Sequence, residues 1–144
     1  MPILIDDLKT LALVGGLKTS AIYIALIVMM GVALTYLVIF KRRSKLIGIG
    51  DGGDHLMARM VRVHGNFCEN APFALALLMM LPLLGGSSFL VHVIGGLFLL
   101  GRIAHAYGLS QSAGKSLGRV VGMVMTHATF LIGAIVLLKA AFAL

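Results

Sequence analysis

The sequence predicts an all-α integral membrane protein, a bundle of four transmembrane helices, on three observations. Of the 144 residues, 60% are hydrophobic and only 12% are charged, and the mean hydropathy is +1.05, whereas a soluble domain is usually about a quarter charged. Several uncharged runs are long enough to cross a hydrocarbon core of about 30 Å. These runs do not alternate polar and apolar residues with period two, as the strands of a membrane barrel would. We therefore expect a single membrane domain over 1–144.

Each helix is predicted from one of these runs. Residues 21–40 form an uncharged run of 20 residues that ends at the basic cluster Lys41-Arg42-Arg43. Residues 70–101 form a second run, of 32 residues, interrupted by Leu-Gly-Gly-Ser-Ser at 84–88, which predicts a tight turn between two helices. Residues 120–138 form the last run. The predicted helices are 20–41, 56–84, 88–108 and 118–140, while residues 1–18 are open to two interpretations, a short interfacial helix or a disordered segment.

The charged residues predict an orientation and exclude several kinds of site. The formal charge is +7, and only Lys9, Lys18 and Lys139 of the 12 basic residues lie outside the first and third loops and the helix ends beside them. Because basic loops stay in the cytoplasm, both termini are expected outside. Basic residues beside long apolar runs indicate a membrane surface, and no nucleic acid is expected. A single cysteine, Cys68, permits neither an intrachain disulfide nor a cysteine-rich metal site.

The most informative feature is a polar stripe on the second predicted helix. Arg59, Arg62, Asn66 and Glu69 are spaced three, four and three residues apart, so they fall within an arc of roughly 80° on one helix face. Ionisable groups inside a membrane usually face a partner or a water-filled cavity. The stripe could hold the bundle together through ion pairs, but we expect Arg62 and Glu69 to lie too far apart for a close pair. Because the stripe has two guanidinium groups and only one carboxylate, its excess positive charge favours an anionic ligand.

Two sequence patterns resemble a known family. The pattern Arg59-x-x-Arg62-x-x-x-Asn66-x-x-Glu69-x-x-Pro72 resembles the second-helix signature of the MAPEG family, the membrane-associated proteins in eicosanoid and glutathione metabolism. The pattern Gly101-Arg102-x-x-His105-x-Tyr107-Gly108 is similar to the bacterial branch, as is Asp51-Gly52-Gly53. The chain therefore resembles a bacterial microsomal glutathione transferase.

The resemblance implies an assembly, a substrate and a site. It implies a homotrimer in the bacterial inner membrane that binds glutathione as co-substrate between neighbouring protomers, near the cytoplasmic end. The other partners would be phospholipid and a lipophilic electrophile from the bilayer, without a metal. Arginine can grip a carboxylate of glutathione with two hydrogen bonds, and glutamate can take its ammonium. The glutathione-binding residues implied are Arg59, Arg62, Asn66 and Glu69, followed by His64, Arg102, His105 and Tyr107.

The resemblance also implies how the thiol is activated. A free thiol has a pKa of about 8.5, so a neighbouring cation is needed to form the thiolate at neutral pH. In the family an arginine near the start of the fourth helix does this, and Arg119 stands there. Lys115 and Arg102 are the alternatives. His105 stands where some members have tyrosine, which weakens any role that depends on tyrosine.

Three functions follow as hypotheses. The first is a detoxifying glutathione transferase that conjugates lipophilic electrophiles or reduces lipid hydroperoxides. The second is a small multidrug-type transporter, in which Glu69 would be the membrane carboxylate. The third is a non-catalytic scaffold that binds lipid. Glutathione binding separates the first from the other two.

Overall fold

The computed structural model describes residues 2–142, which form four helices and contain no strand. The helices are α1 (Pro2–Lys45), α2 (His55–Leu83), α3 (Ser88–Gln111) and α4 (Leu117–Phe142). Each is long and apolar enough to cross a membrane. The predicted four-helix membrane fold is therefore confirmed, and the helix ends agree with the expected ones within a few residues except at the start of α1.

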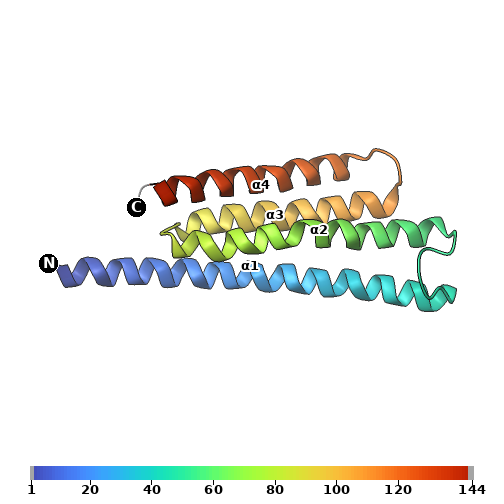
Figure 1. Cartoon of the computed structure of the whole chain (residues 1–144), viewed down its shortest axis with the longest axis horizontal. Helices are drawn as coiled ribbons and strands as arrows, with labels where there is room; N and C mark the ends of the chain where they lie inside the picture. The colour runs from blue at the N-terminus through green and yellow to red at the C-terminus, as the bar shows by residue number, and fades with distance from the viewer. Residues whose placement is uncertain (1, 143–144) are drawn as a thin grey trace.

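The helices lie side by side, with α1 along one edge of the bundle and α4 along the other (Figure 1). Helices α2 and α3 lie between them, and within the described residues α1 makes no contact with α4. Both termini and the α2–α3 turn lie at one end, and the α1–α2 and α3–α4 loops lie at the opposite end (Figure 1). The two loops that carry most of the basic residues therefore share one end of the molecule.

Helix α1 is longer than expected. It begins at Pro2 instead of near residue 20, so residues 2–18 are neither disordered nor a separate interfacial helix. Its 44 residues span roughly 66 Å, about twice the hydrocarbon core. The helix continues through the pair Gly15-Gly16, which packs closely against the end of α2, where a Cβ at Gly16 would lie 2.9 Å from the Cβ of Pro82. The residues before this pair extend beyond the other helices (Figure 1).

Glycines bring the backbones of α3 and α4 into direct contact. A Cβ at Gly122 would lie 2.5 Å from the carbonyl oxygen of Gly101 and 2.6 Å from the backbone nitrogen of His105. A Cβ at Gly118 would lie 2.7 Å from the carbonyl oxygen of Ala104. Small residues are enriched at such crossings because they let membrane helices approach closely. The crossing places the polar residues of α3 beside the first turns of α4.

The start of α2 is fastened to the end of α1 through Asp54. The Asp54 carboxylate accepts a hydrogen bond from the Met57 amide at 2.8 Å and lies 3.0 Å from Nζ of Lys45. The amide bond first, and then Lys45, lower the pKa of Asp54 from 3.8 to about 2. This residue is the N-cap of α2.

Acid is expected to loosen the start of α2. Because the pKa of Asp54 is lower in the folded protein than in the unfolded chain, its stabilisation is full above pH 3.8 and is lost as the pH falls through about 2. Hydrogen-exchange protection of the Met57 amide should fall over this window. An Asp54→Asn variant keeps the cap but not the charge, so its protection should change little between pH 4 and pH 2.

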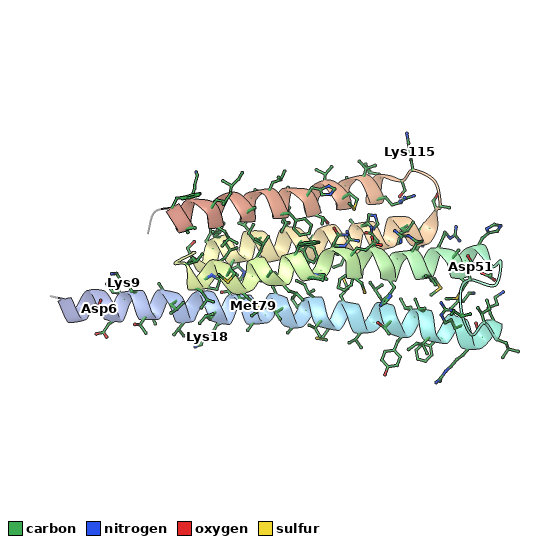
Figure 2. The ribbon with its side chains drawn as sticks, in the orientation of Figure 1. Asp6, Lys9, Lys18, Asp51, Met79 and Lys115 are labelled. Atoms are coloured by element: carbon green, nitrogen blue, oxygen red, sulfur yellow. The ribbon has the colours of Figure 1, made fainter. Side chains whose placement is uncertain are left out.

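Accessibility to a membrane-impermeant thiol reagent tests the orientation. Asp51 and Lys115 lie at the end opposite to Asp6 and Lys9 (Figure 2). In a background that carries Cys68→Ser, we expect Ser44→Cys to be labelled only from the cytoplasmic side and Ala141→Cys only from outside, because basic loops stay inside. The reverse pattern would turn the molecule over and contradict the prediction.

Candidate functional site

Three residues of the polar stripe of α2, Arg59, Arg62 and Asn66, line a pocket near the end of the bundle that holds the two basic loops. The pocket has a volume of about 580 Å³, within the range of small-molecule sites. We call it the basic pocket. It lies between α2, α3, the α3–α4 loop and α4, and its lining residues are His55, Ala58, Arg59, Arg62, Asn66, His105, Leu109, Ala113 and Arg119.

Positive charge accumulates around the basic pocket. Three arginines line it and no acidic residue does. The first turns of α2 and α4 both reach it, through His55 and Arg119, and a helix N-terminus adds partial positive charge. An arginine in the first turn of a helix opposes that helix dipole, so the position of Arg119 costs stability unless an anion is present. The pocket is therefore suited to an anionic ligand.

One expectation about the stripe is wrong. Arg62 and Glu69 form a direct ion pair, with Nη1 of Arg62 3.1 Å from Oε1 of Glu69. The long arginine side chain lies along the helix and spans the two turns that separate the residues. Both side chains remain more than half exposed. The pair holds the arginine in place, but it uses only one of the five guanidinium N–H groups.

The other two arginines of the basic pocket are held by backbone carbonyl groups. Arg59 reaches the carbonyl oxygen of Gln111 at 3.5 Å, at the end of α3, and its Nε is buried without a partner. Arg119 donates from Nη1 to the carbonyl oxygens of Ala113, at 2.9 Å, and of Gly114. Neither residue forms an ion pair with a carboxylate in the described part of the chain, so both charges are available to a ligand.

Arg102 lies inside the bundle, where it is only 1% exposed. Its Nη2 donates to Oδ1 of Asn66 at 2.5 Å and to Nδ1 of His105 at 3.2 Å. Its Nη1 lies 3.4 Å from Oγ1 of Thr126 and 3.8 Å from Sδ of Met123, and no carboxylate pairs with it among residues 2–142. The structure thus places Arg102 behind the basic pocket and not on its wall.

Two further cavities lie along α4, and they share lining residues in turn with the basic pocket and with each other. The first, of about 380 Å³, we call the junction cavity, and His105 and Arg119 line both it and the basic pocket. The second is an apolar groove of about 520 Å³ between α2 and α4, which shares His127 with the junction cavity. Its lining residues are Asn70, Phe73, Ala76, Leu77, Met80, His127, Phe130, Ala134 and Leu137. A charged pocket is thereby linked to an apolar one.

Four of the nine residues expected at the site do not line the basic pocket: Glu69 and Arg102, described above, and also His64 and Tyr107. His64 bonds through Nε2 to Oγ1 of Thr35 on α1, at 3.0 Å, and lies 3.5 Å from Sγ of Cys68. Helical spacing agrees with the position of His64 away from the stripe, because a residue two positions from Arg62 lies about 200° around the helix. Tyr107 is 68% exposed and lines a separate cavity of about 210 Å³.

Two further residues of α4, Thr126 and His127, take part in this region. Thr126 donates to the carbonyl oxygen of Gly122 at 2.8 Å, so its oxygen is free to accept from Arg102. His127 links the junction cavity to the apolar groove. Only the spacing of Gly122 and Thr126, one turn apart, pointed to this part of α4. No group of three or more metal-ligating side chains occurs in the described part of the chain.

Comparisons with known proteins agree with this architecture. A model of the MAPEG family matches residues 20–139. Inner membrane protein YecN of Escherichia coli strain K12 is 32% identical over 89 residues, which cover 62% of this chain and 68% of the relative. The protein of the same name from E. coli O6:H1 gives the same values. With its four apolar helices, the chain is a multi-pass bacterial inner membrane protein. It belongs to the MAPEG family, which includes glutathione transferases and uses glutathione as co-substrate.

Proposed function

We propose that the protein is a membrane glutathione transferase that conjugates glutathione to lipophilic electrophiles. The observation that carries the proposal is the basic pocket, in which three arginines face a cavity that is linked through the junction cavity to an apolar groove. A conjugating enzyme of this kind needs both environments, because its peptide substrate is anionic and its second substrate partitions into the bilayer.

The basic pocket matches the charges of glutathione. The two carboxylates of the peptide can bind Arg59 and Arg62 through charge-assisted hydrogen bonds. Glu69 does not line the pocket but pairs with Arg62 at its edge and is more than half exposed, so it is proposed to take the ammonium group. Asn66 accepts from Arg102 through its oxygen, so its amide nitrogen is left to donate to a carbonyl group of the peptide.

Arg119 is proposed to stabilise the thiolate. It lines both the basic pocket and the junction cavity, where a sulfur held by the first could meet an electrophile that enters through the second. The thiol proton leaves to water, the sulfur forms a bond to the electrophilic carbon, and the leaving group departs with its electron pair. With a lipid hydroperoxide the same thiolate would attack oxygen, and a second glutathione would complete reduction to the alcohol, water and glutathione disulfide.

The apolar groove is proposed to hold the lipophilic substrate. Phe73 and Phe130 lie edge to face on its wall, with ring centroids 5.7 Å apart. His127 stands where the groove meets the junction cavity. An apolar molecule in the groove would therefore present one end towards Arg119.

A homotrimer would give a role to the residues that lie outside the basic pocket. In a single chain, His64 and Tyr107 face other surfaces. With glutathione between neighbouring protomers, as the family resemblance implies, these residues are proposed to contact the peptide held by an adjacent copy.

The other two hypotheses receive less support. A cation transporter requires a free carboxylate inside the membrane, and Glu69 is paired with Arg62. A scaffold requires no thiolate-stabilising cation, yet Arg119 lines the junction cavity. Glutathione binding remains the measurement that separates the enzyme from both.

Calorimetry of the detergent-solubilised protein tests the proposal through Arg62. We expect Arg62→Ala to weaken glutathione binding by about 1.5–3 kcal/mol, the usual value of a hydrogen bond to a charged group, or about tenfold to 150-fold in Kd. Lys139→Ala removes an equal charge at the far end of the bundle and should leave the affinity unchanged. If the Arg62→Ala variant folds and binds with undiminished affinity, Arg62 is a structural ion-pair partner and not a ligand.

A further inference from the structure

The contact between Arg102 and His105 determines which ring nitrogen of His105 carries hydrogen. Nη2 of Arg102 lies 3.2 Å from Nδ1 of His105. A guanidinium group has donors only, so Nδ1 must accept through a lone pair. An imidazole with a lone pair on Nδ1 is neutral and carries its hydrogen on Nε2.

Arg102 has little freedom to release this contact. The nitrogen that bonds His105 also bonds Oδ1 of Asn66. Thr126 accepts from the other terminal nitrogen, because its own hydroxyl hydrogen is donated to Gly122. The guanidinium is thus held from α2, α3 and α4 at once, and the tautomer of His105 is fixed by the packing of all three helices.

The Nε2–H group of His105 is left for a ligand. No described residue hydrogen bonds to this atom. It is also not among the unpartnered polar atoms that are fully buried, so it remains accessible to a ligand. The side chain is 4% exposed, and it lines both the basic pocket and the junction cavity. Among the described residues, only His105 and Arg119 line both. The Nε2–H group of His105, a donor of fixed direction, therefore lies beside Arg119, the cation proposed to stabilise the thiolate.

We propose that His105 is a catalytic residue that donates a hydrogen bond from Nε2 to the sulfur of bound glutathione, and that Arg102 is the positioning residue that fixes its tautomer. This inference rests on the proposed glutathione transferase function. The hydrogen bond stabilises the thiolate as it forms and persists until the carbon–sulfur bond is made. His105 transfers no proton, since the proton of the thiol leaves to water.

The same geometry excludes His105 as the general base. Nδ1 is occupied by Arg102 and Nε2 already carries hydrogen, so the ring has no free lone pair with which to take the thiol proton. A donor and a base respond in opposite ways to replacement by glutamine, whose side-chain amide can donate at the position of Nε2 but cannot accept a proton at neutral pH.

The tautomer is tested first, in the absence of glutathione. In detergent-solubilised protein labelled with ¹⁵N-histidine, the His105 signals are those that disappear in His105→Gln. We expect a protonated Nε2 and an unprotonated Nδ1, and we expect Arg102→Met to give a mixture of tautomers. A doubly protonated ring, or hydrogen on Nδ1, would overturn the inference whatever glutathione does.

Kinetics with glutathione and 1-chloro-2,4-dinitrobenzene test the role at sulfur. We expect His105→Leu to lower kcat about tenfold to a hundredfold, the value of one hydrogen bond to a charged group, with little change in KM for glutathione. His105→Gln should retain most of the activity. The ultraviolet absorbance of bound thiolate should titrate at higher pH in His105→Leu than in His105→Gln.

His92→Leu is the matched control, because it makes the same change on the same helix at a residue that bonds Tyr23 instead. It should leave kcat unchanged. If glutathione binds to His105→Gln but that variant is as inactive as His105→Leu, the residue is a base and the inference fails. Wild-type kinetics in His105→Leu would also overturn it while leaving the proposed function intact. If the wild-type protein itself neither binds nor conjugates glutathione, the proposed function fails, and the role at sulfur fails with it.

Discussion

Replacing Arg119 with alanine is expected to lower conjugation at neutral pH by about tenfold to a hundredfold while glutathione still binds. Arg119 lines the junction of two cavities and has no carboxylate partner among the residues that the structure describes, so its charge can act on a sulfur placed there. Its loss should raise the apparent pKa of the bound thiol by about one to two units, at about 1.4 kcal/mol for each unit. Arg59, Arg62 and Asn66 remain to hold the peptide.

A pH titration of the thiolate absorbance in the complex measures this directly. Conjugation by Arg119→Ala should recover partly at high pH, where the thiol ionises unaided. Arg119→Lys keeps the charge, although lysine cannot reproduce both bonds to the α3–α4 loop. The thiol pKa and the conjugation rate of this variant should therefore lie between those of the wild type and of Arg119→Ala. Should the pKa rise in Lys115→Ala but not in Arg119→Ala, the activating cation would be Lys115.

Replacing Arg102 with alanine is expected to destabilise the bundle by about 3 kcal/mol and to abolish most of the activity. The substitution empties a fully buried site, and large-to-small changes at such sites cost about 2–5 kcal/mol. It also leaves Asn66 and His105 without the donor that orients them. Unfolding of the detergent-solubilised protein would measure the first effect, and conjugation the second.

An Arg102→Met variant separates the two effects. Methionine fills most of the volume, and apolar replacement of a buried charge is often close to neutral for stability. We therefore expect this variant to be clearly more stable than Arg102→Ala and to remain poorly active. Full activity in Arg102→Met would show that Asn66 and His105 do not need the guanidinium.

The membrane fold could be predicted because its signals are local. Uncharged runs of about 20 residues and a Gly-Gly-Ser-Ser break are sufficient to locate four helices and the turn at 84–87. The length of α1 could not be predicted, because the pattern of residues 2–18 suits either a helix or a loop. Helix α1 also packs, through Gly15 and Gly16, against residues some 70 positions away in the sequence, a contact that a local pattern does not reveal.

The stripe on α2 could also be predicted, since it needs only helical spacing. The residues that face the stripe could not be predicted, because they depend on how α3 crosses α4. The contact between Gly101 and Gly122 sets this crossing, and it decides that Arg102 lies behind the basic pocket while His105 lies on its wall. The ion pair between Arg62 and Glu69 depends on side-chain reach, which spacing along the helix axis does not describe.

The buried guanidinium of α3 has a consequence for biogenesis. During synthesis α3 reaches the membrane before α4 exists, so Arg102 then lacks Thr126 and Met123, and only its contacts with Asn66 and His105 can form. An arginine in an inserting helix costs up to about 3.5 kcal/mol. The loop to α4 has only five residues, 112–116, and the two helices touch through their glycines. We therefore expect α3 and α4 to enter the membrane together as a hairpin, and a chain truncated before α4 to insert α3 less efficiently than the full-length chain.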